Sequence, residues 1–208
     1  MSVLTKTLWL YAIALDEVQG FFSASPELAA ELTEQAADVI VEPATKHLIG
    51  KVGPLFRRPV EPVVDIPLPS ADDVENLVEG KAIAPDRLYP AWTIVRHWCE
   101  ARALGRLTVE LTDMQLSEID FHLVSGGLSS QFSLETIIAR DPHLPLHPAN
   151  KLRVGWMPAA HAAQAGPQWP IALAEGRLSD DVMALAEQLA GFFTQVPDWG
   201  TDVLALTQ

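Results

Sequence analysis

The feature that most constrains the fold is the segment TLWLYAIAL, which spans Thr7 to Leu15. It is short and rich in aromatic and aliphatic side chains, and both of its alternating faces are apolar. Successive residues of a strand point to opposite sides of the sheet, so a strand of this composition needs cover on both sides. We therefore expect a strand here that is buried on both faces.

Helix starts are marked by local capping signals. Ser25 and Pro26 supply an N-cap and a first-turn proline, Ser70 precedes several acidic residues, and Thr112 with Gln115 forms a capping-box pattern. These and related signals, with Asp16 as the cap of the first helix, predict helices over 16–22, 26–40, 71–79, 90–104, 113–125, 130–140, 158–164, 167–174 and 179–193. Shorter apolar stretches predict strands over 106–111 and 151–157 and a closing strand at VLAL near residue 205.

These elements predict an α+β fold, because helices outnumber strands and do not alternate strictly with them. A length of 208 residues suits a single domain with one core, mainly helical, with a small mixed or antiparallel sheet. The proline-rich segment 54–69 interrupts regular structure. Its apolar side chains indicate an extended connection across the body of the domain, in place of a solvated linker.

The charge balance restricts the classes of partner. The chain carries 27 acidic and 14 basic side chains, a net charge of -13. Such a surface repels nucleic-acid phosphates and anionic membranes, so neither is expected as a partner. A basic protein is electrostatically favoured, although an acidic surface also serves solubility alone.

Cysteine usage and hydropathy indicate a cytoplasmic protein. Cys99 is the single cysteine and cannot form an internal disulfide, which fits a reducing compartment. No window has the roughly 18 apolar residues of a membrane span, and the apolar run at Leu8 to Tyr11 is too short for an export signal.

The segment WTIVRHWCEAR, from Trp92 to Arg102, places potentially reactive side chains close together in sequence. On a helix, His97 and Cys99 point apart, so they cannot form a nucleophile–base pair. Cys99 falls among apolar positions and is interpreted as a small buried hydrophobe. Arg102 falls within the same apolar arc, where it either extends to water or pairs with a buried acid.

The candidate catalytic residues are Asp120, His122 and Arg102. Asp120 falls on the apolar side of its predicted helix, and a buried carboxylate needs a partner. Arg102 is the expected partner, which would make the pair structural. Convergence of these residues with a loop histidine, His143 or His147, would instead give a small-molecule enzyme.

The candidate binding residues are Trp156, Trp169, His143 and His147. The tryptophans lie among glycines and prolines and either line a recognition pocket or fill the core. The histidines flank LPL in a proline-broken loop and lack an H-E-x-x-H or cysteine context, so no metal site is expected. The glycines of SGGLSS match no nucleotide-binding pattern, and no cofactor is expected.

Four segments, VGPLFRRP, LYPAWTIVRHWCE, LPLHP and KLRVGWM, resemble an actinobacterial family of domains of unknown function. The opening strand, followed by ALDEVQGFF and an acidic helix, is similar to the YfbM-like group of small bacterial proteins as far as about residue 40. The resemblance implies a bacterial cytosolic α+β domain and brings no functional residue with it.

Two classes of function follow from the sequence. The absence of a coherent catalytic pattern and the acidic charge favour a non-catalytic binding protein, such as an immunity-like inhibitor of a basic toxin. The alternative is the small-molecule enzyme built from Arg102, Asp120, His122 and a loop histidine. A structural subunit of a homo-oligomer is a third hypothesis.

Overall fold

A computed structural model describes residues 5–40, 67–175 and 178–208 of the chain. Four strands make up one sheet: β1 (Thr5–Ala12), β2 (Gly105–Thr112), β3 (Arg153–Met157) and β4 (Val203–Thr207). The helices are α1 (Leu15–Gly20), α2 (Pro26–Ala36), α3 (Ala71–Val78), α4 (Leu88–Arg102), α5 (Asp113–Ser125), α6 (Leu134–Ala139), α7 (Ala159–Ala165), α8 (Gln168–Glu175) and α9 (Asp180–Trp199). Two short 3-10 helices, η1 (Pro85–Arg87) and η2 (Ser130–Phe132), precede α4 and α6.

The sheet is antiparallel throughout and has the order β2-β1-β4-β3. Its two central strands come from opposite ends of the described chain. Leu10 of β1 lies opposite Leu107 of β2 on one side and Ala205 of β4 on the other. The four-stranded sheet is therefore complete only when the last strand pairs with the first.

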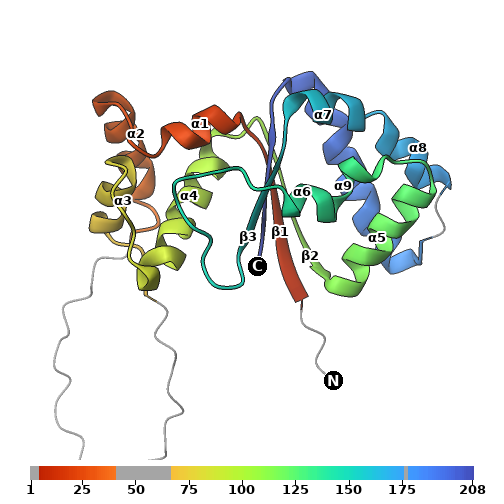
Figure 1. Ribbon diagram of the computed structural model, residues 1–208, viewed down its shortest axis with the longest axis horizontal. Coiled ribbons are helices and arrows are strands. Elements are labelled where there is room, and N and C mark those ends of the chain that lie inside the picture. The colour runs from red at the N-terminus through yellow and green to blue at the C-terminus, as the bar shows by residue number, and fades with distance from the viewer. Residues whose placement is uncertain (1–4, 41–66, 176–177) are drawn as a thin grey trace, which may run out of the picture.

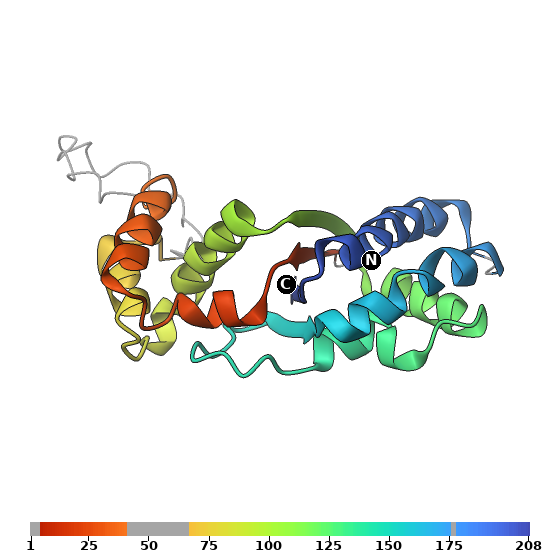
Figure 2. The ribbon, with the colours of Figure 1, turned by 90° about the horizontal axis from the view of Figure 1, so that it is seen from above.

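Helices cover both faces of this sheet. In Figures 1 and 2, α1–α4 lie on one side of the sheet, and α5–α9 lie on the other. Neighbouring residues of β1 enter different cores: Leu10 packs with the α5–α9 layer, and Tyr11 packs with the α1–α4 layer. Both are essentially inaccessible to water. The prediction of a strand buried on both faces is confirmed, although the strand ends at Ala12.

The predicted α+β class, mainly helical with a small antiparallel sheet, is confirmed. The helix expected over 130–140 is in fact two pieces, because Ser133 is extended and its side chain accepts a hydrogen bond from the Thr136 amide as the N-cap of α6. Residues 54–66 of the predicted proline-rich connection lie outside the described residues. Among the described helices, none combines the length and apolar character that a bilayer span requires.

Asp202, just before β4, joins the two helical layers at one end of the sheet. Its Oδ2 accepts a hydrogen bond from the Leu15 amide at the start of α1 (2.8 Å), and its Oδ1 accepts one from the Ala159 amide at the start of α7 (2.7 Å). A carboxylate at two helix N-termini satisfies two otherwise unpaired donors. The predicted capping of α1 by Asp16 is wrong, because Asp16 lies inside α1 and the carboxylate of Asp202 binds the first amide.

The substitution Asp202→Ala should lower the free energy of unfolding by about 2–3 kcal/mol, because it removes two N-terminal caps at once. Urea denaturation followed by circular dichroism measures the change. Asp198→Ala is the matched control, since Asp198 is a nearby exposed acid and should have little effect. An equal loss in both variants would contradict the double-cap role of Asp202.

Candidate functional site

The reactive-looking stretch on α4 does not form a reaction centre. Cys99 is fully buried, and burial raises the pKa of its thiol. His97 turns toward α2, where its Nε2 lies 2.9 Å from the Gln35 carbonyl oxygen. The two side chains therefore have different neighbours, as predicted from their helical spacing.

Arg102 anchors α4 to the two helices that follow β1. Its Nε donates to Glu17 of α1 and its Nη1 donates to Glu31 of α2, both at 2.7 Å. Arg102 does pair with acids, but Glu17 and Glu31 are 37% and 53% exposed, so the buried acid that was one of the two alternatives is not its partner. The expected pairing of Arg102 with Asp120 is wrong. The acids that bind Arg102, Glu17 and Glu31, belong to the helical layer that contains α4, whereas Asp120 lies on α5 in the other layer.

Asp120 caps a helix. Its two carboxylate oxygens accept hydrogen bonds from the amides of Leu134 (2.8 Å) and Glu135 (2.7 Å), the first residues of α6. It is buried, as predicted. Burial raises the pKa of Asp120 to about 6, although the two amide hydrogen bonds act in the opposite direction. Its partners are thus backbone groups, and its role at this position is structural.

The enzyme site envisaged from Arg102, Asp120 and His122 is not assembled. The sheet separates Arg102, in the α1–α4 layer, from Asp120 and His122 on α5 (Figure 1). His122 is half-buried and meets the ring of Phe121 edge-on at 5.4 Å. These three residues therefore share no pocket.

The two candidate tryptophans support the structure. Trp169 is fully buried and stacks on Phe193 with ring centroids 4.3 Å apart, so it fills the core and cannot contact a ligand. Trp156 is half-buried, and its Nε1 donates to the Asp141 carbonyl oxygen at 3.1 Å. This bond holds the loop that carries the candidate histidines.

His143 and His147 lie on that loop and line one hollow together with Asp141. Nδ1 of His143 is 3.4 Å from Oδ2 of Asp141, and both side chains are largely exposed. Within residues 5–40, 67–175 and 178–208, no group of three or more His, Cys, Asp or Glu side chains is arranged to hold a metal ion. The hollow therefore offers an exposed His–Asp pair.

Among the described residues, the two most exposed large apolar side chains lie on α5. Met114 is 79% exposed, Phe121 is 68% exposed, and Val124 is also exposed. The three residues are spaced by seven and three positions, which places them on one side of the helix. We call Met114, Phe121 and Val124 the α5 apolar face. Large apolar side chains grouped at the surface are typical of interaction sites.

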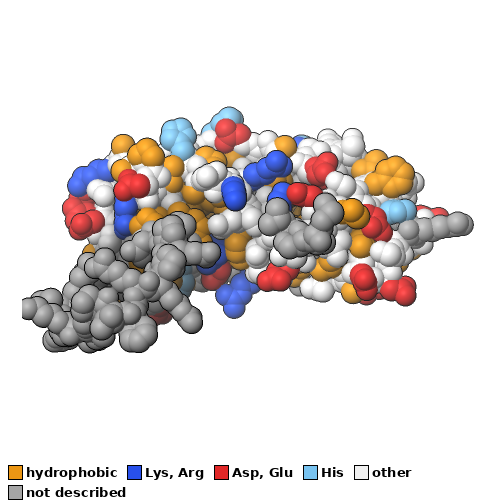
Figure 3. Space-filling view, turned by 90° about the horizontal axis from the view of Figure 1, so that it is seen from below, with side chains coloured by type: hydrophobic (Ala, Val, Ile, Leu, Met, Phe, Trp, Pro, Cys, Tyr) orange, Lys and Arg blue, Asp and Glu red, His pale blue; other side chains and the backbone are white. Residues whose placement is uncertain are grey.

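Acidic side chains surround the α5 apolar face. Asp113 and Glu118 belong to α5 itself, and Glu135 belongs to α6. Between α5 and α6 lies a shallow hollow, whose lining residues include Glu135, Asp120, Phe121, Val124 and three serines. Ser117 donates to Glu135 at 3.1 Å, which fixes this acid beside the face. Figure 3 shows apolar and acidic side chains side by side at the end of the molecule that carries this layer.

Sequence reasoning missed this surface. On this helix the sequence pointed only to Asp120 and His122, because of their chemistry. The available signal was the presence of Met114 and Phe121 on the polar side of an amphipathic helix, where burial cannot explain them.

The chain matches no family model, no curated protein and no solved structure. The resemblances noted for the sequence therefore stay predictions, and the functional argument depends on the site itself.

The titration of Asp120 should be visible in the pH dependence of stability. Because its pKa in the folded protein, about 6, lies above the ordinary value of 3.8, its contribution is fully present below about pH 4 and is lost as the pH rises through 6. Between pH 4 and pH 7, the free energy of unfolding of the wild type should therefore fall by up to about 3 kcal/mol more than that of Asp120→Asn.

Urea denaturation at a series of pH values measures this difference, with Asp198→Asn as the exposed control. Asp198→Asn should keep the wild-type pH dependence. If Asp120→Asn also keeps it, the carboxyl of Asp120 does not titrate in this range.

Proposed function

We propose that this chain is a non-catalytic binding protein whose partner is a basic protein that docks on the α5 apolar face. The observation that carries the proposal is the grouping of Met114, Phe121 and Val124 at the surface, with acids around them. Apolar anchors at the centre and charges at the rim are the usual anatomy of a protein interface.

The charge of the partner follows from the rim. Asp113 pairs with Lys6, but Glu135 is held by a neutral serine and Glu118 by Ser179, so their charges are not cancelled by these contacts. The net charge of -13 adds a long-range attraction for a basic surface. An immunity-like inhibitor of a basic toxin is one form of this function, and the cytosol is the compartment we propose for it.

The cheapest test is affinity capture from a bacterial cytosol, with the double variant Met114→Ser/Phe121→Ser compared with the wild type. The wild type should retain a basic protein at low salt and lose most of it at about 0.5 M salt, because rim charges are screened within a few ångströms. The double variant should retain at least about tenfold less, since central apolar anchors dominate interface energies.

Leu104→Ser is the matched control, because Leu104 is an exposed leucine (63%) that lies between α4 and β2 and is not part of the α5 apolar face. It should capture as much partner as the wild type. Size-exclusion chromatography of the same variants separates the homo-oligomer alternative: self-association that is lost only in the double variant would assign the α5 apolar face to a second copy of the chain. Capture that does not depend on this face would contradict the proposal.

A further inference from the structure

The two edges of the sheet differ in how they are covered. At the β3 edge, the Trp156 amide donates to the Arg140 carbonyl oxygen (3.1 Å) and the Trp156 indole donates to the Asp141 carbonyl oxygen (3.1 Å), so a neighbouring segment lies along that strand. At the other edge, β2 pairs only with β1 among the described strands. In Figure 2, β2 runs along the outer border of the molecule between α4 and α9. An open edge strand offers a row of unpaired backbone groups to another strand.

The pairing pattern shows which backbone groups of β2 are unused. Thr7 exchanges two hydrogen bonds with Gln208 (2.9 and 3.1 Å), so the odd-numbered residues of β1 bond to β4. Bonding directions alternate along an antiparallel strand, and the even-numbered residues of β1 therefore bond to β2. Their partners are Gly105, Leu107, Val109 and Leu111. The backbone groups of Arg106, Thr108 and Glu110 consequently point away from β1, and we call these three residues the β2 edge.

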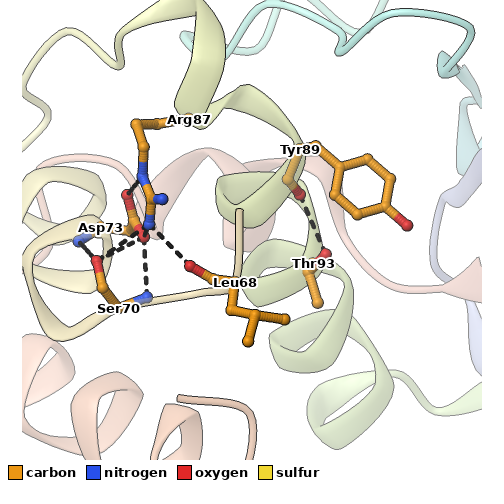
Figure 4. A network of polar contacts seen from close by, with 6 residues as sticks. All are labelled: Leu68, Ser70, Asp73, Arg87, Tyr89 and Thr93. Atoms are coloured by element: carbon orange, nitrogen blue, oxygen red, sulfur yellow. Dashed lines mark hydrogen bonds and ion pairs between the residues drawn. The ribbon is translucent and has the colours of Figure 1, made fainter. Parts of the chain in front are cut away.

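Arg106 and Glu110 are exposed and have no partner of opposite charge among the described residues. Arg106 makes one long contact, 3.4 Å from its Nη1 to the Glu100 carbonyl oxygen. Arg87, in contrast, binds acceptors of its own chain, namely the carboxylate of Asp73, the hydroxyl of Ser70 and the carbonyl oxygen of Leu68 (Figure 4). The β2 edge thus carries one positive and one negative charge that the described chain does not match.

These two charges are placed symmetrically about Thr108. When two copies of β2 pair antiparallel about a twofold axis at Thr108, residue 106 of each copy lies opposite residue 110 of the other. Arg106 then faces Glu110 of the second copy at both ends of the pairing. On the other face of the sheet, Leu107 lies opposite Val109 of the second copy. Pairs of opposite charge and pairs of aliphatic side chains both stabilise antiparallel strands.

The same register matches the unused backbone groups. The residues of the β2 edge form three facing pairs, and each pair exchanges two N–H···O=C hydrogen bonds. The ladder ends near Thr112, because the Thr112 amide already donates to the Gln115 side chain (2.8 Å). Pairing would join the four-stranded sheets of two copies into one continuous sheet.

We infer that β2 binds β2 of a second copy of this chain, antiparallel and centred on Thr108. Another strand would satisfy the same backbone groups, but the symmetric placement of Arg106 and Glu110 fits a second copy. The net charge of -13 on each copy opposes association. At about 0.15 M salt, charges more than about 8 Å apart are largely screened, so the adjacent pairs dominate. The β2 edge is not part of the α5 apolar face, so the inference stands apart from the proposed function.

Charge exchange in the full chain tests the register. In sedimentation velocity at about 0.15 M salt, the wild type should change from monomer to dimer between about 5 and 500 µM. Arg106→Glu places two glutamates opposite each other, and Glu110→Arg places two arginines opposite each other. Each variant alone should therefore self-associate at least about tenfold more weakly. An equimolar mixture of the two should dimerise as the wild type does, because every facing pair then contains one acid and one base.

Thr108→Pro tests the backbone ladder. The substitution removes the central amide, which points away from β1, so the variant should stay folded by circular dichroism but self-associate at least about tenfold more weakly. Arg153→Glu on β3 and Glu34→Arg on α2 are the matched controls, because both residues are exposed and the changes of charge are the same. Both controls should dimerise as the wild type does.

The Met114→Ser/Phe121→Ser variant should also dimerise, so this inference and the proposed function can fail separately. Three results would overturn the inference. These are a wild type that stays monomeric up to about 500 µM, single charge variants that associate as the wild type does, and a mixture of them that associates no better than either alone. The concentration series of the wild type and Thr108→Pro stand even if a charge variant does not fold.

Discussion

The pairing of β1 with β4 is the interaction on which the rest of the structure depends. These strands lie at opposite ends of the described chain, yet they form the centre of the sheet, and each helical layer packs on one of its faces. Residues 203–207 are all buried, so β4 contributes to both cores as β1 does. Asp202 strengthens the same junction by capping a helix in each layer. Long-range pairing of this kind makes the two layers one structural unit.

This arrangement also explains why the chemically notable side chains do not converge. Because helices cover both faces of the sheet, α4 and α5 lie in separate layers. Arg102 and Asp120 therefore find partners in their own layers: Arg102 binds two acids, and Asp120 binds two backbone amides. What remains available to partners is the outer surface of each layer and the β2 edge of the sheet.

Local features could be predicted from the sequence and distant ones could not. Ser25, Ser70 and Thr112 cap the helices that their neighbours predict, because an N-cap contacts amides only two or three positions away. The Asp202 cap on Leu15 joins residues 187 positions apart and leaves no pattern in either segment. The same holds for Arg102 with Glu17 and Glu31, and for the contact of Arg96 with the ring of Trp9. A single sequence shows which residues are apolar and which are charged, but the order of the strands in the sheet determines which partner each of them meets.

Hydrogen exchange of the backbone amides tests most directly whether β1–β4 pairing holds both layers together. If it does, the slowest amides of β1 and β4 and those in the cores of α4 and α9 should exchange with one common free energy, equal to that of global unfolding. Exchange of α4 through a separate opening of much lower free energy, while β1, β4 and α9 stay protected, would contradict the account.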